Sequence, residues 1–342
     1  MIKKFIIAVT IASMMGLTGC YDNEEIDTLA TVMAVGIEVA EASELSRYTF
    51  AVADTSGYSS DSKGDGASMK CFSQVSSDIK SAVEHINRKL SKRLSFSHLS
   101  AILFSKESAY SDMYDDVSYF EKTASVRPQA LIAISDTNPS VYLKNLKPEL
   151  ESNPERYFQN IFQKTKGYVS SLRMCDFTNS YHCGTQTLAP VITAKSQEEN
   201  ISEDKSFVIG SALISKGRFI AEFTDNWVIG LFLGTKTVNY KGIRLKSTKT
   251  PDIKINIKDD IAAVDAQLYV KADGELDSKS ASADIERFLK SAAVKACDVI
   301  DVKSAAKRMF YLQKSYDKYD WEQLLKNAEF DVKVNLVSGD LK

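Results

Sequence analysis

This chain of 342 residues has few histidines, few long apolar runs and almost no excess of either charge. Lysine and arginine together number 43 against 45 aspartates and glutamates, so the composition argues against nucleic acid as a partner. No polybasic membrane patch is apparent either. After the opening segment nothing approaches 18 uninterrupted apolar residues, so we expect the body of the protein to be soluble and extracytoplasmic.

Catalytic motifs are missing as well. The sequence has no GxSxG, HExxH, GxxxxGK[ST] or GxGxxG pattern, the common signatures of hydrolases, metalloproteases and nucleotide-binding enzymes. Of the three histidines, His85 falls on the outer face of an expected helix and His98 precedes an expected strand. His182 adjoins Cys183, but neighbouring side chains of an extended chain point in opposite directions. We therefore expect no enzyme activity and no metal site.

The one long apolar segment opens the chain, MIKKFIIAVTIASMMGLTGC. A short basic start precedes the apolar stretch from Phe5 to Met15, the pattern of a secretory signal peptide. Its small residues end at Gly19 and Cys20, and this ending resembles the bacterial lipobox. We predict cleavage between Gly19 and Cys20, with a diacylglycerol and acyl lipid on Cys20 as the only attached group. A signal peptide with a chance cysteine, or an uncleaved anchor, is the alternative.

The other four cysteines are Cys71, Cys175, Cys183 and Cys297. An exported protein could oxidise them, and Cys175 with Cys183 would then close a small loop. Unpaired thiols are an equally good interpretation, and the spacing fits no standard zinc site.

Apolar positions alternate, or recur with helical spacing, along the rest of the chain. Expected strands cover residues 29–40, 47–53, 98–105, 130–134, 207–214, 218–223, 238–245, 253–257, 261–271 and 330–337. Expected helices cover 73–94, 107–122, 227–232, 284–300, 303–316 and 321–327, and the pairs Asn138-Pro139 and Asn153-Pro154 predict two further capped helix starts. Without a strict strand–helix–strand rhythm, the pattern favours an α+β fold with largely antiparallel sheets.

Two polar segments suggest where domains begin. Residues 20–28 form an expected lipidated tether after the signal peptide at 1–19, and the acidic stretch 196–206 is an expected linker. We therefore divide the chain into an N-terminal region at 29–196, with two subdomains, and a C-terminal domain at 197–342. A hairpin with its turn at Lys216 and Gly217 would begin the C-terminal domain.

Several short motifs follow one another in a characteristic order. Gly19-Cys20-Tyr21-Asp22 leads to Glu25-Ile26 and then to Val35-Gly36-Ile37-Glu38. Together with later positions they resemble the Ger(x)C family, the lipoprotein C subunit of GerA-type spore germinant receptors. Tyr21 stands where the family usually has Trp, Ala221 where it has Gly and Asn226 where it has Glu, which suggests a divergent member. The motif positions, of unknown role, are Asp22, Glu25, Ile26, Gly36, His98, Arg127, Gly230 and Trp321.

The resemblance implies a three-domain α+β protein held by its lipid on the extracytoplasmic face of the spore inner membrane. It implies a non-enzymatic receptor subunit that works with two integral-membrane subunits, A and B, in germination triggered by small nutrients. Two other functions remain open from the sequence. One is a solute-binding lipoprotein of a transport system, and the other is an envelope hydrolase with an unrecognised site.

Overall fold

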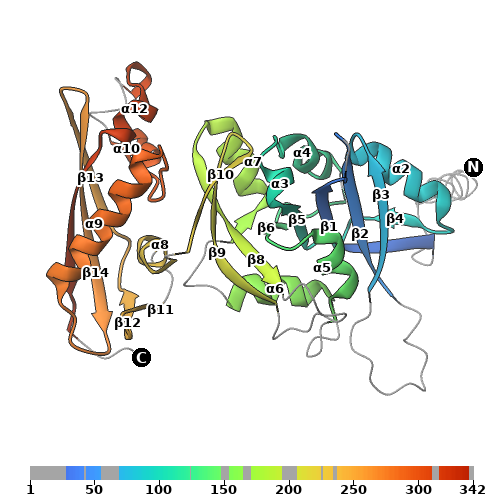
Figure 1. The fold of residues 1–342 in the computed structure, drawn as a ribbon, viewed down its shortest axis with the longest axis horizontal. Helices are drawn as coiled ribbons and strands as arrows, with labels where there is room; N and C mark the ends of the chain where they lie inside the picture. The colour runs from blue at the N-terminus through green and yellow to red at the C-terminus, as the bar shows by residue number, and fades with distance from the viewer. Residues whose placement is uncertain are drawn as a thin grey trace, which may run out of the picture.

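The computed structural model describes residues 28–41, 44–54, 69–123, 125–147, 154–164, 171–194, 206–224, 226–233, 237–309 and 316–338. Their strands form a ten-stranded sheet and a five-stranded sheet, which follow one another along the long axis of the molecule (Figure 1). Helices accompany both sheets, and antiparallel strand pairs outnumber parallel ones. The expected α+β class with largely antiparallel sheets is confirmed.

The first sheet has a parallel centre and antiparallel edges, in the order β10-β9-β8-β6-β5-β1-β2-β3. Strands β1, β5, β6 and β8 run parallel, while hairpins add β2 and β3 at one edge and β9 and β10 at the other. The strands are β1 Leu29–Val39, β2 Ser46–Ala53, β3 Met69–Ser76, β4 Arg93–Ser95, β5 Ala101–Ser105, β6 Leu131–Ser135, β7 Leu172–Arg173, β8 Gln186–Ala194, β9 Ser206–Ser215 and β10 Arg218–Phe223.

Helices cover both faces of this sheet, which explains why its central strand β5 is buried at every position. In β5, Ile102 and Phe104 face one core while Ala101 and Leu103 face the other. The first core includes residues of α2 Ile79–Lys89, α3 Lys106–Ala109, α4 Tyr114–Lys122 and α7 Met174–Cys183. The second includes α5 Pro139–Asn145 and α6 Pro154–Lys164.

The second sheet carries its helices on one face only. Along β14, Val264, Leu268 and Val270 are buried against α9 side chains such as Ile285 and Leu289, and the residues between them are more exposed. This alternation is typical of a half-covered antiparallel sheet. Its elements are β11 Thr237–Tyr240, β12 Ile243–Ser247, β13 Asp252–Lys258, β14 Ile261–Ala272, β15 Glu329–Leu336, α8 Asn226–Leu233, α9 Ser278–Val294, α10 Val302–Arg308, η4 Tyr316–Lys318 and α12 Trp321–Lys326.

Helix α9 also protects an edge of this sheet. The backbone N–H groups of Val332 and Val334 on β15 donate to Glu286 Oε1 at 3.0 Å and to Ser282 Oγ at 3.2 Å. An open strand edge would be a template for pairing with other chains, so these two side chains of α9 occupy donors that would otherwise face solvent.

Several expected elements differ from the structure. The strand expected over 238–245 is the hairpin of β11 and β12. The helix expected over 284–300 is α9, which ends at Val294, and the one expected over 303–316 is α10, which ends at Arg308.

The helix expected over 73–94 is strand β3 followed by the shorter α2, so Val75 lies on a strand. The helix expected over 107–122 is two helices, α3 and α4. Asn138 precedes Pro139 at the start of α5, but it makes no capping bond with its side chain. Glu38 does so instead, because its carboxylate accepts the backbone N–H of Ser140 at 3.0 Å.

The hairpin after residue 206 belongs to the first sheet, not to the second. Its turn at Lys216 and Gly217 is as expected, with φ values of 47° and 73°. Strand β9 pairs with β8 from Gln186 to Ala194, however, so the hairpin extends the N-terminal sheet. The two sheets therefore meet at α8, and the expected division at residue 196 does not coincide with the boundary between them.

Candidate functional site: the cleft between the two sheets

An apolar junction joins the two halves of the molecule. One hydrophobic core contains Leu188 of β8 and Leu213 of β9 together with Val228 and Ile229 of α8 and the inner face of the second sheet. Helix α8 lies between the sheets in Figure 1. Because the core crosses from one sheet to the other through this helix, burial of apolar surface holds the halves together.

Gln186 adds a polar link across the same junction. Its amide Nε2 donates to the carbonyl of Ala296 at 2.9 Å, and its Oε1 accepts the backbone N–H of Asp298 at 2.6 Å. A single side chain of β8 thus satisfies two backbone groups in the loop between α9 and α10. Leaving such buried groups unpaired would cost free energy, so the bonds also fix the position of that loop.

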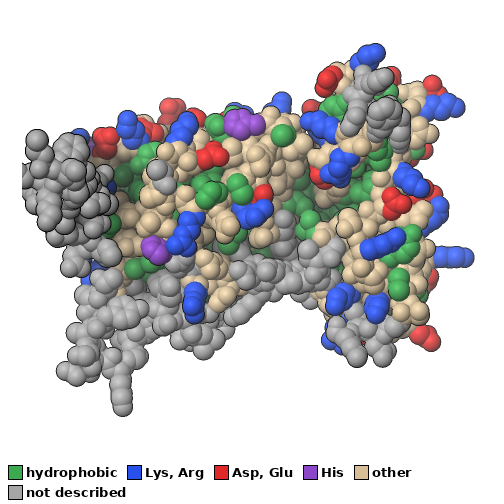
Figure 2. Space-filling view, turned by 180° about the vertical axis from the view of Figure 1, so that it is seen from behind, with side chains coloured by type: hydrophobic (Ala, Val, Ile, Leu, Met, Phe, Trp, Pro, Cys, Tyr) green, Lys and Arg blue, Asp and Glu red, His purple; other side chains and the backbone are tan. Residues whose placement is uncertain are grey.

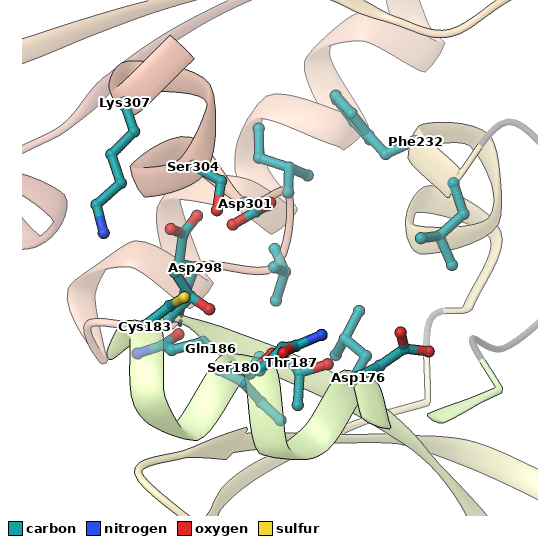
Figure 3. A pocket seen from close by; sticks show the side chains of 17 residues that line it. Asp176, Ser180, Cys183, Gln186, Thr187, Phe232, Asp298, Asp301, Ser304 and Lys307 are labelled. Atoms are coloured by element: carbon teal, nitrogen blue, oxygen red, sulfur yellow. Dashed lines mark hydrogen bonds between the residues drawn. The ribbon is translucent and has the colours of Figure 1, made fainter. Parts of the chain in front are cut away.

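Beside the junction lies a cleft of about 530 Å³, a volume within the range of small-molecule sites. Figure 3 shows α7 on one side, the loop and α10 opposite, and α8 closing one end. The lining is partly apolar, from Leu188, Leu213, Phe232, Leu233, Val299 and Ile300. Polar lining groups include Asp176, Ser180, Cys183, Asp298, Ser304 and Lys307.

Asp298 is the most perturbed group of the cleft. Asp298 is 5% exposed, and burial raises the pKa of its carboxyl group to about 6. The two oxygens accept the backbone N–H groups of Val302 at 2.6 Å and Lys303 at 2.9 Å, at the start of α10. Asp298 therefore holds the first turn of that helix, a structural role that accounts for its burial.

The remaining cleft residues do not form a reacting group. Asp176 is engaged in a two-bond ion pair with Arg173, at 2.7 and 3.0 Å. Lys307 lies 4.9 Å from the ring of Tyr316. Among the described residues no set of three or more histidines, cysteines or acids is placed to hold a metal ion. The cleft thus combines apolar and polar lining groups, and Asp298 and Asp176 are each engaged with other parts of the chain.

The family-motif strand β1 shows a close contact with α5. A Cβ atom on Gly36 would lie 2.7 Å from Cβ of Pro139, so only glycine allows this approach. Two positions on, the buried carboxylate of Glu38 accepts both the N–H and the Oγ–H of Ser140, at 3.0 and 2.7 Å, and pairs with Arg47 at 3.3 Å. Gly36 and Glu38 thus position the start of α5, which is a structural explanation for this motif.

The other motif positions do not converge on one site. His98 is half-buried before β5, and the exposed Arg127 precedes the neighbouring β6, at the same end of the first sheet. Gly230 is buried in α8. Trp321 opens α12, where its Nε1 donates to the carbonyl of Tyr316 at 3.0 Å and the two rings stack. Gly19, Cys20, Asp22, Glu25 and Ile26 lie outside the described residues.

Helix α7 settles the two questions about its cysteines. Cys175 and Cys183 are both free thiols near opposite ends of α7, roughly 12 Å apart along the axis, which is too far for a disulfide. His182 and Cys183 are neighbours on this helix and not on an extended chain as expected. The ring Nε2 of His182 is 3.0 Å from the Tyr114 hydroxyl, so its polar contact is with a tyrosine.

The surface of the described residues carries charges of both signs. Figure 2 shows acidic and basic side chains interspersed over one face, with apolar side chains visible where the two halves meet. Among the described helices, none is both long and apolar enough to span a bilayer.

Comparison with known proteins agrees with the motifs. A family model described as the spore germination protein N-terminal domain matches residues 22–194, about half of the chain. Spore germination protein KC of Bacillus subtilis (strain 168) is 24% identical over 200 residues, which cover 56% of this chain and 49% of that protein. The aligned part thus spans about half the length of this relative.

The fold agreement extends over both sheets. The crystal structure of the GerBC protein superposes with a TM-score of 0.50 at 14% identity, covering 89% of this chain and 97% of that one. The two-sheet α+β fold and the motifs of its first half are those of a spore germination protein. The chain belongs to the Ger(x)C family.

Sequence reasoning missed the cleft. Its walls come from segments more than a hundred residues apart, as the contact of Gln186 with Asp298 shows. Neither residue belongs to a motif, and a buried Asp ahead of a helix is an ordinary capping pattern. The hairpin after residue 206 extends the first sheet, and this pairing places α8, with Phe232, at the junction. The sequence alone does not reveal that pairing.

Proposed function

We propose that this chain is the lipid-anchored, non-enzymatic C subunit of a nutrient-germinant receptor and that it acts in spore germination with two integral-membrane subunits, A and B. One observation carries the proposal. The match to the germination-protein family begins at residue 22, two residues after Cys20 of the lipobox-like ending. Cleavage before Cys20 would leave the lipid directly at the edge of the family domain.

Lipidation would be sufficient to keep the protein on a membrane. Each buried CH₂ group of an acyl chain contributes about 0.8 kcal/mol, so two or three chains hold a protein where a single chain would not. The protein would then lie on the extracytoplasmic face of the spore inner membrane, with Tyr21 to Asp27 as its tether. The described chain begins its first strand at Leu29, soon after that tether.

A non-enzymatic role is supported by how the polar groups are used. Asp298 caps α10, Asp176 pairs with Arg173, and Glu38 holds the start of α5. These carboxylates are committed to structure, and the histidines His85, His98 and His182 lie in different parts of the first half. This arrangement supports a role through contact with other proteins.

The cleft favours one alternative, a solute-binding lipoprotein of a transport system. Its volume of about 530 Å³ would hold a small solute between two halves of the chain. The second sheet, with helices on one face only, differs from the paired α/β lobes usual in such proteins. Thermal denaturation with candidate nutrients distinguishes the two, because a ligand at 100 times its Kd adds about 2.7 kcal/mol to the stability.

The proposed function is tested with spores that lack this gene. They should lose or slow germination in response to at least one nutrient, while germination by a route that bypasses nutrient receptors stays normal. Wild-type protein should restore the response, and Cys71→Ala, which removes a free thiol of β3 away from the cleft, should restore it equally. Cys20→Ala should restore it poorly. Normal germination of the mutant spores with every nutrient that triggers the parent strain would refute the proposal.

A further inference from the structure

Four basic residues gather at one end of the first half. The sequence from Arg88 to Arg93 reads RKLSKR, and we call Arg88, Lys89, Lys92 and Arg93 the basic cluster. All four are exposed, and the Arg88 side chain is 74% exposed. Between residues 84 and 93 the only acidic residue is Glu84, whose carboxylate is 3.9 Å from Arg88. The overall charge balance of the chain conceals this local excess.

The fold places the cluster where the described chain begins. Arg93 opens β4, and its register partner in the parallel pairing with β1 is Leu29, the first residue of that strand. Leu29 follows Cys20 by nine residues, which span at most roughly 30 Å when fully extended. Figure 1 shows α2 and β4 at the end of the molecule opposite the second sheet. The cluster is therefore within reach of a membrane that holds a lipid on Cys20.

The fold itself does not require all four charges. Helix α2 is packed by Ile79, Val83 and Ile86 on its other face, and it is capped by Asp78. Positive residues in the last turn favour the helix dipole, which gives Arg88 and Lys89 a local role. Lys89 donates to Oε1 of Gln74, an uncharged partner, so this bond does not neutralise the charge of Lys89. Lys92 lies beyond the helix, where the helix dipole does not account for its charge.

We propose that the basic cluster binds the headgroup phosphates of anionic phospholipids and orients the first sheet on the membrane. The proposal rests on the proposed lipid anchor for its geometry, and it adds a second membrane contact to that anchor. One acyl signal combined with a basic patch is a general route to stable attachment. Each Lys or Arg near an anionic surface adds about fivefold to the binding constant. Asp22, Glu24, Glu25 and Asp27 in the tether oppose this attraction and reduce the total.

Vesicle binding by the mature chain without its lipid, residues 21–342, tests the cluster apart from the anchor. We expect at least tenfold tighter binding to vesicles containing phosphatidylglycerol than to phosphatidylcholine vesicles, and loss of the difference in 0.5 M salt. Arg88→Gln, Lys89→Gln, Lys92→Gln and Arg93→Gln together should abolish the preference. Circular dichroism establishes that this variant is folded.

A matched variant controls for net charge. Lys254, Lys258, Lys290 and Lys295 are exposed residues of the second half, and changing all four to Gln removes the same charge. This control should keep the preference for anionic vesicles. Equal binding of the wild type to both vesicles, or equal losses in the two variants, would overturn the proposal. It would also be overturned if a preference appeared only after the four tether acids were neutralised, because the tether itself would then occupy the cluster.

These outcomes leave the proposed function separately testable. A chain that ignores anionic vesicles could still be anchored by Cys20 and still act in germination. Conversely, a chain that binds such vesicles through the basic cluster would do so even if the germination assay failed.

Discussion

Replacing Gly36 with alanine tests how β1 positions α5. The added Cβ would lie 2.7 Å from Cβ of Pro139 and 3.1 Å from Cδ1 of Leu143, whereas carbon atoms pack at about 3.5–4.0 Å. Helix α5 must therefore move by roughly 1 Å. That movement also stretches the bonds from Ser140 to Glu38, now 3.0 and 2.7 Å long. Overpacking of this kind costs about 1–3 kcal/mol, and Gly→Ala regains about 0.4–1 kcal/mol from the unfolded chain.

The net expectation for Gly36→Ala is a loss of about 1–2 kcal/mol in the free energy of unfolding, measured by urea denaturation. Gly274→Ala is the matched control, because the nearest atom to its Cβ would be 3.7 Å away and its φ is not positive. The control has no such clash, so it should leave the stability unchanged or raise it by up to about 1 kcal/mol. Equal stability of Gly36→Ala and Gly274→Ala would refute the close-packing explanation of the motif.

Three further predictions concern other parts of the chain. Burial raises the pKa of Asp116, which accepts a bond from Tyr48, from 3.8 to about 6, so the folded chain binds this proton more tightly than the unfolded chain. Between about pH 4 and 7 this group therefore adds stability as the pH falls, by up to about 3 kcal/mol, and Asp116→Asn should remove that part of the pH dependence of chemical denaturation. Gln186→Leu should destabilise the protein by about 1–3 kcal/mol in thermal unfolding, because it leaves the N–H of Asp298 unpaired, whereas Gln323→Leu on the exposed face of α12 should have little effect. Cys20→Ala should shift the protein from the membrane to the soluble fraction of spore lysates, and retention at the wild-type level would contradict the lipid anchor.

The sequence predicted local structure best where one physical signal dominates. The turn at Lys216 and Gly217 needs two residues with positive φ, and the hairpin around it forms as expected. The alternation along β14 reflects a sheet with one buried face, and that strand was located within a residue or two. Signals of this kind depend only on near neighbours in the chain.

Predictions failed where distant contacts decide. Val75 fits the helical spacing of α2, yet it pairs with Arg47 of β2 and extends the sheet edge. Asn138 is a good capping residue by propensity, but Glu38, a hundred residues earlier, caps α5. The hairpin after residue 206 looked like the start of a new domain because an acidic segment precedes it. Its pairing with β8 is a tertiary contact that local composition does not report.

The basic cluster shows the same limit in electrostatics. A net charge near zero suggested that no membrane-binding patch exists, because the count averages over the whole chain. The pairing of β1 with β4 places this short basic segment beside Leu29, where the first strand of the described chain begins. Charge distribution, and not net charge, determines how a surface meets a membrane.

The central claim is that this chain is a lipid-anchored subunit of a receptor with two integral-membrane partners. Affinity purification of the tagged protein from detergent-solubilised spore membranes, followed by mass spectrometry, tests it directly. We predict recovery of two polytopic membrane proteins in constant proportion to this chain, together with a mature N-terminus at an acylated Cys20. Purification of the chain alone, or with the components of a solute transporter, would contradict the account.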